Sequence, residues 1–447
     1  MTALSETKRY QAYPEYKDSG VEWLGEIPSH WKTCRLKHLA SIKNGQDYKA
    51  VQSEVGYPVM GSGGQFAFAT EFMYDKPSVL LGRKGTIDKP LYINEPFWTV
   101  DTMYYTEMQP ETDAKYLYYL ATTIQFARYS TNTALPSMTQ EHLGNYIFAV
   151  PVEVSDRTQI ANFLDHETAK IDTLIEKQQQ LIKLLKEKRQ AVISHAVTKG
   201  LNPQAPMKDS GVEWLGEVPE HWVVSKFAFL KKVLTDYTAN GSFADLKANV
   251  QYLDEPSFAR LVRLTDLRKD LQNDNGVWVD EKSYKYLKKS ALFGGEFLLA
   301  NVGAYAGLFY QMPFEKGPAS LAPNMFMAKF DDSKVSREFM AYVGQSSPVA
   351  SQLRLSATAS SAQPKLNKDD FKSVSFCYPT LREQNEIVEH LNQEVRKIEQ
   401  LLTKQERAIA LMQERRTALI SAAVTGKIDV RNWQAPTPEY QAMEQTA

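Results

Sequence analysis

Histidine, cysteine and glycine-rich motifs carry much of the catalytic and metal chemistry of proteins, and this chain of 447 residues has few of them. Its 7 histidines form no HxxxH or HExxH pattern, the spacing that puts two zinc ligands on one face of a helix. Its 2 cysteines, Cys34 and Cys377, are too few for a zinc site or a disulfide framework, and we interpret them as buried or partly buried thiols. We therefore expect no metal site in this chain.

Two other motifs have both a chemical and a structural interpretation. Gly61-Ser62-Gly63-Gly64 is glycine-rich, but no nucleotide-binding glycine motif follows a strand and opens a helix, so we interpret it as a turn. Asp113-Ala114-Lys115 has an Asp-x-Lys spacing like that of nuclease metal sites, but it has no evident upstream acidic partner, which favours a helix start. The NPPY and DPPY loops of amino-methyltransferases are absent. We expect a chain that is not itself an enzyme and binds no cofactor.

The element that must position any binding residue is a long helix, predicted over residues 157–199 because this stretch has no Pro or Gly. Gly200 and Pro203 end it. At 1.5 Å per residue it would be about 60 Å long, so it needs a partner. Alternate steps of four and three predict a coiled-coil seam of Ile160, Leu164, Glu167, Ile171, Leu174, Gln178, Leu181, Leu185, Lys188, Val192 and His195.

The predicted partner is a second helix of the same chain. The offset that carries Ile160 onto Ile387, applied to the whole seam, gives positions of matching character, which are Ile387, Leu391, Glu394, Ile398, Leu401, Gln405, Ala408, Met412, Arg415, Leu419 and Ala422. The helix ends match as well, since SHAVT at 194–198 corresponds to SAAVT at 421–425. Two unrelated amphipathic helices would not be expected to share three polar interruptions in one register.

A second repeat precedes each variable part of the chain. Residues 17–31 and 208–222 match at 13 of 15 positions, which indicates an internal duplication. Trp23, Leu24, Ile27, Pro28 and Trp31 of the first copy are predicted to form an apolar clip that seats a domain against the long helices. The segment after each helix also repeats, as Gln-Ala-Pro at 204–206 and 434–436, so the two chain ends are expected to approach each other.

Two variable blocks lie between the repeats, and both contain short β-like runs broken by Gly, Pro and Asn, followed by a short helix. We predict an α+β chain in which two globular α/β domains are joined by two long helices that form an antiparallel coiled coil, with a circular pseudo-twofold duplication. The predicted segments are an arm and first clip at 1–31, a first domain at 32–154, a central helix at 155–200, a linker and second clip at 201–222, a second domain at 223–380, a distal helix at 381–430 and a tail at 431–447.

Charge limits how strongly the chain alone can bind nucleic acid. Its net charge is −1, with net +4 over residues 223–378, +3 over 157–199 and zero over 32–150. Phosphate contacts need Lys and Arg, so binding by this chain alone should be modest and a partner protein would supply more positive surface. No apolar run is long enough to span a bilayer and the first residues lack an apolar signal core, so we expect a cytoplasmic protein without a membrane partner.

With its two DSGVEWLGE-x-P-x-HW clips, two variable blocks and two helices ending SHAVTKG and SAAVTGK, the whole chain resembles the specificity subunit of a type I restriction-modification system. The resemblance implies that residues 32–154 and 223–380 are target recognition domains, each reading one half of a bipartite, asymmetric site on double-stranded DNA. It also implies that the paired helices set the spacer and bind two adenine-specific methyltransferase subunits, which restriction motor subunits then join. S-adenosylmethionine, ATP and Mg would be used by those partners. One departure is that the first helix begins DRTQI where the second has LREQNEI.

Under this resemblance, polar residues beside glycines are the candidates for DNA contact, because base edges are read by donors and acceptors while Lys and Arg on phosphates set the register. In the first block they are Ser62, Gln65, Arg83, Lys84, Arg128, Ser130, Asn132 and Thr133. In the second block they are Arg260, Arg263, Asn301, Tyr305, Arg354, Ser360, Ser361, Gln363 and Lys365. A solvated loop side chain is the alternative for each residue taken singly.

The polar seam residues are predicted to fix the direction and register of the helix pair. In an antiparallel pair Gln178 and Gln405 lie near the centre, and the charged residues Glu167 and Lys188 fall roughly opposite Arg415 and Glu394, respectively. A slip of one heptad, about 10 Å, would move the reading domains by roughly three base pairs. Two alternatives remain open at this point: the recognition subunit of a type IIB-like restriction enzyme, and a coiled-coil adaptor that does not touch DNA.

Overall fold

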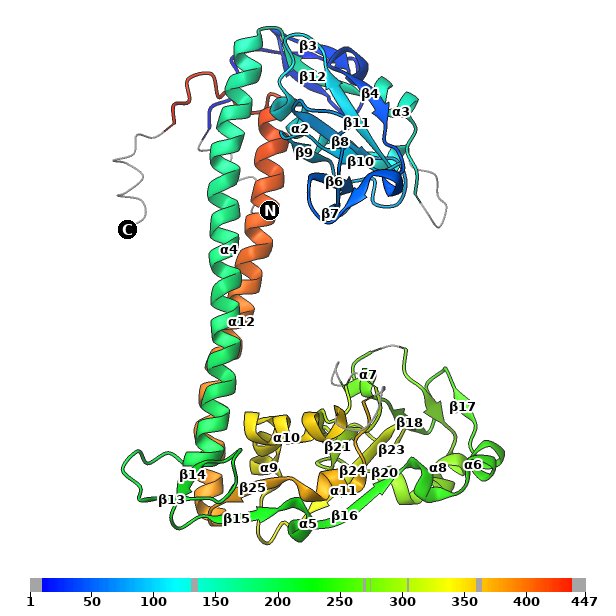
Figure 1. Cartoon of the computed structure of the whole chain (residues 1–447), viewed down its shortest axis with the longest axis vertical. Coiled ribbons are helices and arrows are strands. Elements are labelled where there is room, and N and C mark those ends of the chain that lie inside the picture. Colours follow the sequence, from blue (N-terminus) through cyan, green and yellow to red (C-terminus); the bar gives the residue numbers. More distant parts are fainter. Residues whose placement is uncertain are drawn as a thin grey trace. The chain divides into compact units, whose positions relative to one another are not determined.

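The computed structural model describes residues 10–129, 136–267, 271–273, 275–303, 305–358 and 364–435. Two compact units divide the chain, the first made of residues 1–179 and 406–447 and the second of residues 180–405 (Figure 1). Each unit combines a mixed α/β domain with parts of two long helices, and we keep for these domains the name recognition domain from the expectation above. In the described ranges, no helix has the length and apolar character needed to cross a bilayer.

The first recognition domain is built on an antiparallel sheet and a smaller second sheet. In sheet order, the main strands are β4 (Ala40–Asn44), β11 (Met103–Met108), β8 (Ser78–Gly82) and β9 (Leu91–Ile93), and the second sheet has β10 (Trp98–Thr99), β6 (Tyr57–Gly61), β7 (Gly64–Ala69) and β5 (Gln52–Ser53). Strand pairs β1 (Tyr16–Asp18) with β2 (Glu26–Pro28) and β3 (Trp31–Arg35) with β12 (Ile147–Pro151) complete the sheets. The helices are α2 (Ala114–Ala121) and α3 (Gln140–Asn145).

The second recognition domain repeats the main sheet in the same strand order and enlarges the other. Its main sheet is β16 (Lys231–Asp236), β24 (Met325–Phe330), β21 (Phe297–Ala300) and β22 (Phe309–Gln311), and the enlarged sheet is β17 (Tyr252–Leu253), β19 (Trp278–Val279), β18 (Ala259–Val262), β23 (Ala319–Leu321) and β20 (Ala291–Leu292). The strand pairs are β13 (Met207–Asp209) with β14 (Glu217–Pro219) and β15 (Val223–Lys226) with β25 (Ser375–Tyr378). Its helices are α5 (Phe227–Leu230), α6 (Phe243–Asn249), α7 (Leu264–Leu267), α8 (Glu281–Tyr286), α9 (Arg337–Gln345), α10 (Ser347–Thr358) and α11 (Lys368–Ser373).

The two predicted long helices are present as α4 (Val154–Lys199) and α12 (Leu381–Val424). In the first unit the start of α4 packs against the end of α12, since Ile160 and Val424 belong to one buried cluster. In the second unit the end of α4 packs against the start of α12, where Val197 and Leu391 share a cluster. The helices therefore run in opposite directions within each unit. Gly200, with a φ of 74°, ends α4 as predicted, because a left-handed residue at this position is tolerated best by glycine.

The predicted seam is wrong at alternate positions. Leu174 and Leu401 are 47% and 44% exposed, whereas their neighbours Ile175 and Leu402 are half-buried. The same shift recurs one heptad later, where Leu181 is exposed and Ile182 is half-buried. From Ile171 onward the inward positions are reached by a step of four residues followed by a step of three. The prediction used the reverse order, a step of three followed by a step of four. Because both neighbours are apolar at each of these steps, apolarity alone did not distinguish the two orders.

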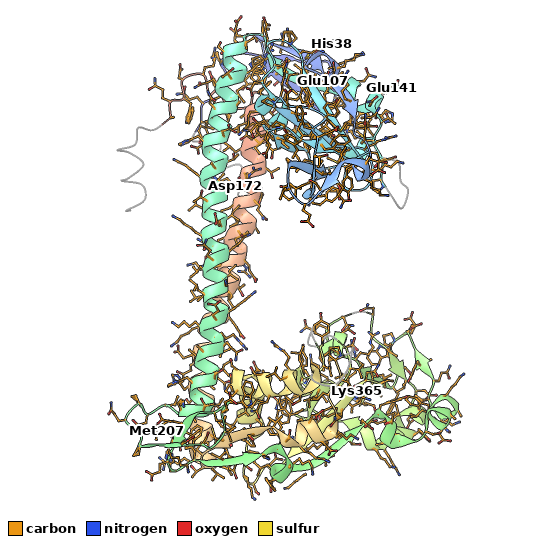
Figure 2. The ribbon with its side chains drawn as sticks, in the orientation of Figure 1. His38, Glu107, Glu141, Asp172, Met207 and Lys365 are labelled. Atoms are coloured by element: carbon orange, nitrogen blue, oxygen red, sulfur yellow. The ribbon has the colours of Figure 1, made fainter. Side chains whose placement is uncertain are left out.

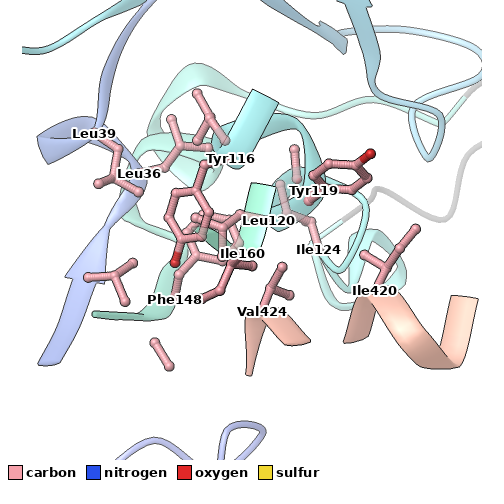
Figure 3. Close-up of a cluster of buried hydrophobic side chains, with 14 of the residues drawn as sticks. Leu36, Leu39, Tyr116, Tyr119, Leu120, Ile124, Phe148, Ile160, Ile420 and Val424 are labelled. Atoms are coloured by element: carbon pink, nitrogen blue, oxygen red, sulfur yellow. The ribbon is translucent and has the colours of Figure 1, made fainter. Parts of the chain in front are cut away.

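The clip seats each domain on the long helices, as predicted. Ile27 and Trp31 are fully buried in the cluster of the first unit that includes residues of α2, α4 and α12, part of which Figure 3 shows. Val218 and Trp222 are fully buried in the corresponding cluster of the second unit. Described segments near the two chain ends are in contact within the first unit, where the Asp429 amide donates to the carbonyl of residue 11 at 2.7 Å. Both cysteines are free thiols, Cys34 half-buried and Cys377 buried, as expected.

Candidate nucleic-acid interface

In the first recognition domain, the turn after β8 is joined to the loop before α3. The Gly85 amide donates to the Pro136 carbonyl at 3.0 Å, and the Met138 amide donates to the Arg83 carbonyl at 3.0 Å. Gly85 has a φ of 82°, a conformation that glycine adopts without strain. The turn that carries the predicted contacts Arg83 and Lys84 is therefore held beside residues 136–138, which were not predicted as DNA contacts.

The same pair of bonds recurs in the second recognition domain, between the turn after β21 and the loop before α11. The Gly303 amide donates to the Pro364 carbonyl at 2.9 Å, and the Leu366 amide donates to the Asn301 carbonyl at 2.9 Å. Gly303 has a φ of 91°, like its counterpart Gly85. One backbone arrangement thus presents different side chains, with Arg83 in the first domain where Asn301 stands in the second.

A third segment joins this arrangement in each domain. In the first, the Arg83 amide donates to the Thr102 carbonyl at 2.9 Å and the Val100 amide donates to the Met60 carbonyl at 3.2 Å, which links the turn to the end of β6. In the second, the equivalent bonds run from the Asn301 amide to the Asn324 carbonyl at 3.1 Å and from the Ala322 amide to the Val262 carbonyl at 2.9 Å. We call each set of three segments a loop cluster, comprising residues 60–65, 83–85 and 136–138 in the first domain and residues 262–266, 301–303 and 364–366 in the second.

The candidate residues of the first loop cluster differ in their exposure. Gln65 and Lys84 are exposed and Ser62 is half-buried. Arg83 is half-buried, its guanidinium donating to the Asp101 carbonyl at 3.2 Å. Arg128 lies apart from the loop cluster, with its guanidinium 5.4 Å from the Trp23 ring of the clip. Three further candidates lie outside the described residues, and these are Ser130, Asn132 and Thr133.

Two candidate arginines of the second domain bond to their own loop. Arg260 is only 8% exposed and donates to the Leu271 carbonyl and to Asn273 Oδ1, both at 2.7 Å. Arg263 donates to both carboxylate oxygens of Asp266, which is fully buried. These contacts support a structural role for the two arginines, which is to hold the loop after β18, and do not support a direct contact with DNA. Asp266 was not predicted, although its i,i+3 spacing from Arg263 is a signal for such a pair.

The remaining candidates of the second domain lie near its loop cluster. Asn301 is half-buried, and its Oδ1 has no hydrogen-bond partner within the described ranges. Tyr305 is 41% exposed, and Arg354 on α10 and Lys365 are also exposed; Lys365 is labelled in Figure 2. Ser360, Ser361 and Gln363 lie outside the described residues.

The predicted register residues have the following places. Glu167, in α4, accepts a hydrogen bond from the Tyr10 hydroxyl at 3.3 Å. Glu394 accepts from Lys397 at 2.7 Å, and this bond, together with the more distant charge of Lys188, lowers the pKa of Glu394. Arg415 is exposed. Two further predicted residues, Gln178 in the first unit and Gln405 in the second, are half-buried.

Two other ion pairs link the long helices, and they occupy equivalent positions. Arg416 Nε lies 2.9 Å from Asp172 Oδ1 in the first unit; Asp172 is labelled on α4 in Figure 2. Arg189 Nε lies 3.6 Å from Glu399 Oε1 in the second unit. The offset that relates the two long helices carries Arg189 onto Arg416 and Asp172 onto Glu399, so one pair is the repeat of the other.

A shallow groove also recurs at equivalent positions of the two long helices. In the first unit Asn162, Asp165 and His166 of α4 line it together with Trp433. In the second unit the residues equivalent to those three line a groove on α12, and these are Glu389, Asn392 and Gln393. The same helix surface is thus left accessible in both halves of the chain.

Comparisons with known proteins agree on one family. The family model of the type I restriction modification DNA specificity domain matches residues 28–184 and 267–409. The chain is 22% identical over 294 residues to the StySPI specificity subunit of Salmonella potsdam, covering 65% of this chain and 59% of that protein. It is 21% identical over 462 residues to the EcoBI specificity subunit of Escherichia coli, covering 97% of this chain and 93% of that protein.

A solved structure shows the same fold. The chain matches a protein chain in a solved structure that concerns complex assembly and conformational transition of the type I R-M system, with a TM-score of 0.66 and 14% sequence identity. The match covers 90% of this chain and 99% of the other.

Proposed function

The chain belongs to the family of type I restriction-modification specificity subunits, and we propose that each of its two recognition domains reads one half of a bipartite, asymmetric site on double-stranded DNA. The observation that carries this proposal is the duplicated loop cluster. In both domains the same backbone hydrogen bonds hold three segments together, while the side chains at equivalent positions differ, as at Arg83 and Asn301. Base edges are distinguished by the donors and acceptors offered to them, so a shared scaffold with different polar groups suits two different half-sites.

We also infer that the long helices pair as an antiparallel coiled coil that sets the spacer between the half-sites. Their opposite direction within each unit and the two equivalent ion pairs support this role. A register shift would change the separation of the two readers by about 1.5 Å per residue.

The recurring groove supports the docking of two copies of one partner, which we infer to be the methyltransferase subunits that restriction motor subunits then join. A surface built twice from equivalent helix positions suits a partner that binds twice. In this assignment the chain contributes no catalytic group and binds no cofactor of its own. S-adenosylmethionine, ATP and Mg belong to the partner subunits.

The proposal is tested by mapping N6-methyladenine across the genome in cells with and without this chain, in the presence of its partner subunits. We expect one bipartite motif that is methylated only when the chain is present. A methylation pattern unchanged by the deletion would contradict the proposal and favour an adaptor that does not touch DNA.

A further inference from the structure

The fourth residue of α4, Arg157, ties the helix to the first recognition domain. It is 8% exposed, and its Nε donates to the carbonyl of Pro151, the last residue of β12, at 2.9 Å. Its Nη1 reaches the carbonyl of Glu111, three residues before α2 begins, at 3.5 Å. One buried side chain thus connects the long helix to the end of the last strand and to the approach of the short helix.

The fourth residue of α12, Gln384, makes the same connections in the second unit. It is fully buried, and its Nε2 donates to the carbonyl of Pro379, the residue after β25, at 2.9 Å. The same atom donates at 2.8 Å to the carbonyl of Lys334, three residues before α9 begins. The two helix starts, DRTQI and LREQNEI, thus differ in having Arg157 at the position where the second helix has Gln384. The contacts with the end of the last strand and with the approach to the short helix are made by both residues.

A second contact recurs farther along each long helix. Tyr119, the sixth residue of α2 and labelled in Figure 3, donates its hydroxyl to Asp165 Oδ1 on α4 at 2.6 Å. Tyr342, the sixth residue of α9, donates its hydroxyl to Asn392 Oδ1 on α12 at 2.7 Å. Asp165 and Asn392 are each the twelfth residue of their helix, so the position of the contact is repeated as well.

Each recognition domain is thus held at two points of its long helix that are eight residues apart, about 12 Å at 1.5 Å per residue. Apolar packing between the domain and the helix is non-directional, whereas hydrogen bonds depend on distance and angle. Two directional contacts at separate points oppose both pivoting and sliding of the domain. The same contact geometry occurs in both units although the residue types differ. This indicates that each recognition domain is held in the same position on its own long helix.

We propose that Arg157, Tyr119, Gln384 and Tyr342 are positioning residues that set the angle of each recognition domain on its helix and thereby the spacing of half-sites that the chain accepts. The proposal rests on the proposed function, because only a reader of two half-sites has a spacing to select. It differs from a purely structural role in one respect: weakening these contacts should broaden the accepted spacing without changing the bases read in either half-site.

The test uses the full chain expressed with its methyltransferase partners and a plasmid library that carries the wild-type half-sites with the native spacer or with one base pair more or fewer. The measurement is the ratio of methylation at altered spacers to methylation at the native spacer. Each of the single variants Tyr119→Phe and Tyr342→Phe should raise this ratio about fivefold, the effect of one ordinary hydrogen bond.

Two controls separate positioning from stability. Tyr116→Phe removes a buried hydroxyl of the same short helix that has no partner in the part of the chain that the structure describes, so it should leave the ratio unchanged. Arg157→Gln places the second copy's residue in the first copy and should keep the wild-type ratio, whereas Arg157→Met should raise it.

The outcomes distinguish this inference from the proposed function. If the tyrosine variants lower methylation equally at every spacer, in proportion to their loss of thermal stability, the residues are only structural and the inference is overturned. A wild-type chain that methylates no bipartite motif would overturn the proposed function and this inference with it.

Discussion

At the scale of single residues, the second recognition domain uses charge to hold a loop where the first uses a short glycine turn. Asp266 is fully buried between Arg260 and Arg263, which also bond to backbone carbonyls of residues 271–275. The first domain has the short turn Gly61-Ser62-Gly63-Gly64 at the equivalent point. Arg260 and Arg263, which the sequence suggested as DNA contacts, therefore bond to their own loop in this structure.

This network predicts a pH-dependent stability of the second recognition domain. Burial alone would raise the pKa of Asp266, but hydrogen bonds from Arg263 and Asn273 outweigh it and hold the pKa below its usual value. Because the folded pKa is depressed, the stabilisation is fully present above the unfolded value of about 3.9 and is lost as the pH falls through the folded value. Asp266→Asn should lower the free energy of unfolding at pH 7 by about 3 kcal/mol and flatten its dependence on pH below 5.

Denaturant unfolding of the full chain between pH 3 and pH 7 measures this effect. Glu255→Gln, which removes an exposed carboxylate outside this network, serves as the matched control. An equal loss of stability in both variants, or an unchanged pH profile in Asp266→Asn, would show that the network does not hold the loop.

At the scale of elements, the contacts between the two long helices in the first unit recur in the second unit, and this includes an ion pair at equivalent positions. Asp172 with Arg416 and Glu399 with Arg189 are partly exposed pairs, each worth about 0.2–1 kcal/mol. Such energies do not hold two long helices together, but they penalise a shifted register in which like charges would meet. They add to the predicted register residues, of which Glu394 has its nearest partner, Lys397, within its own helix.

Charge reversal tests the register role of the Asp172 pair. Arg416→Glu should lower the thermal unfolding midpoint at low salt, because two carboxylates then face each other, and adding Asp172→Arg should restore it. The matched control is Arg407→Glu, an exposed arginine of the same helix. The difference should shrink in 1 M salt, where the Debye length is about 3 Å. A double variant no more stable than the single one would remove the pair from the register argument.

At the scale of the whole molecule, one chain carries two recognition domains of common design. Their main sheets share a strand order, their loop clusters share hydrogen bonds, and the longer second block contains α6, α7 and α8 between β16 and β20. Separate clusters of buried side chains hold each domain to its helices. The two recognition domains are therefore expected to be exchangeable one at a time.

Replacing residues 223–380 by the equivalent block of a relative should change one half of the methylated motif and leave the other half and the spacer unchanged. Genome-wide mapping of N6-methyladenine provides the measurement, with the exchange of residues 32–154 as the reciprocal control. A change in both halves from a single exchange would show that the blocks do not read independently.

Much of this organisation is present in the sequence because it is repeated there. The clip returns at 13 of 15 positions, the two helices match at one constant offset, and glycines mark the turns that carry candidate contacts. Repeats of this kind identify the domains and their order without any knowledge of packing. Glycines also marked the turns at residues 83–85 and 301–303 of the loop clusters, because a glycine at positive φ, such as Gly85 or Gly303, suits the local backbone. Residues 136–138 of the first loop cluster were not identified in this way.

The tertiary structure decided which side chain of a local pair faces inward. Ile175 lies inward where Leu174 was predicted, and Arg260 is buried within its own domain. Arg157 makes in the first unit the contacts that Gln384 makes in the second. In each case the partner atoms come from residues distant in sequence or from carbonyls whose direction depends on the folded backbone. Residue type and spacing state what a side chain can bond to, and only the assembled neighbours determine what it does bond to.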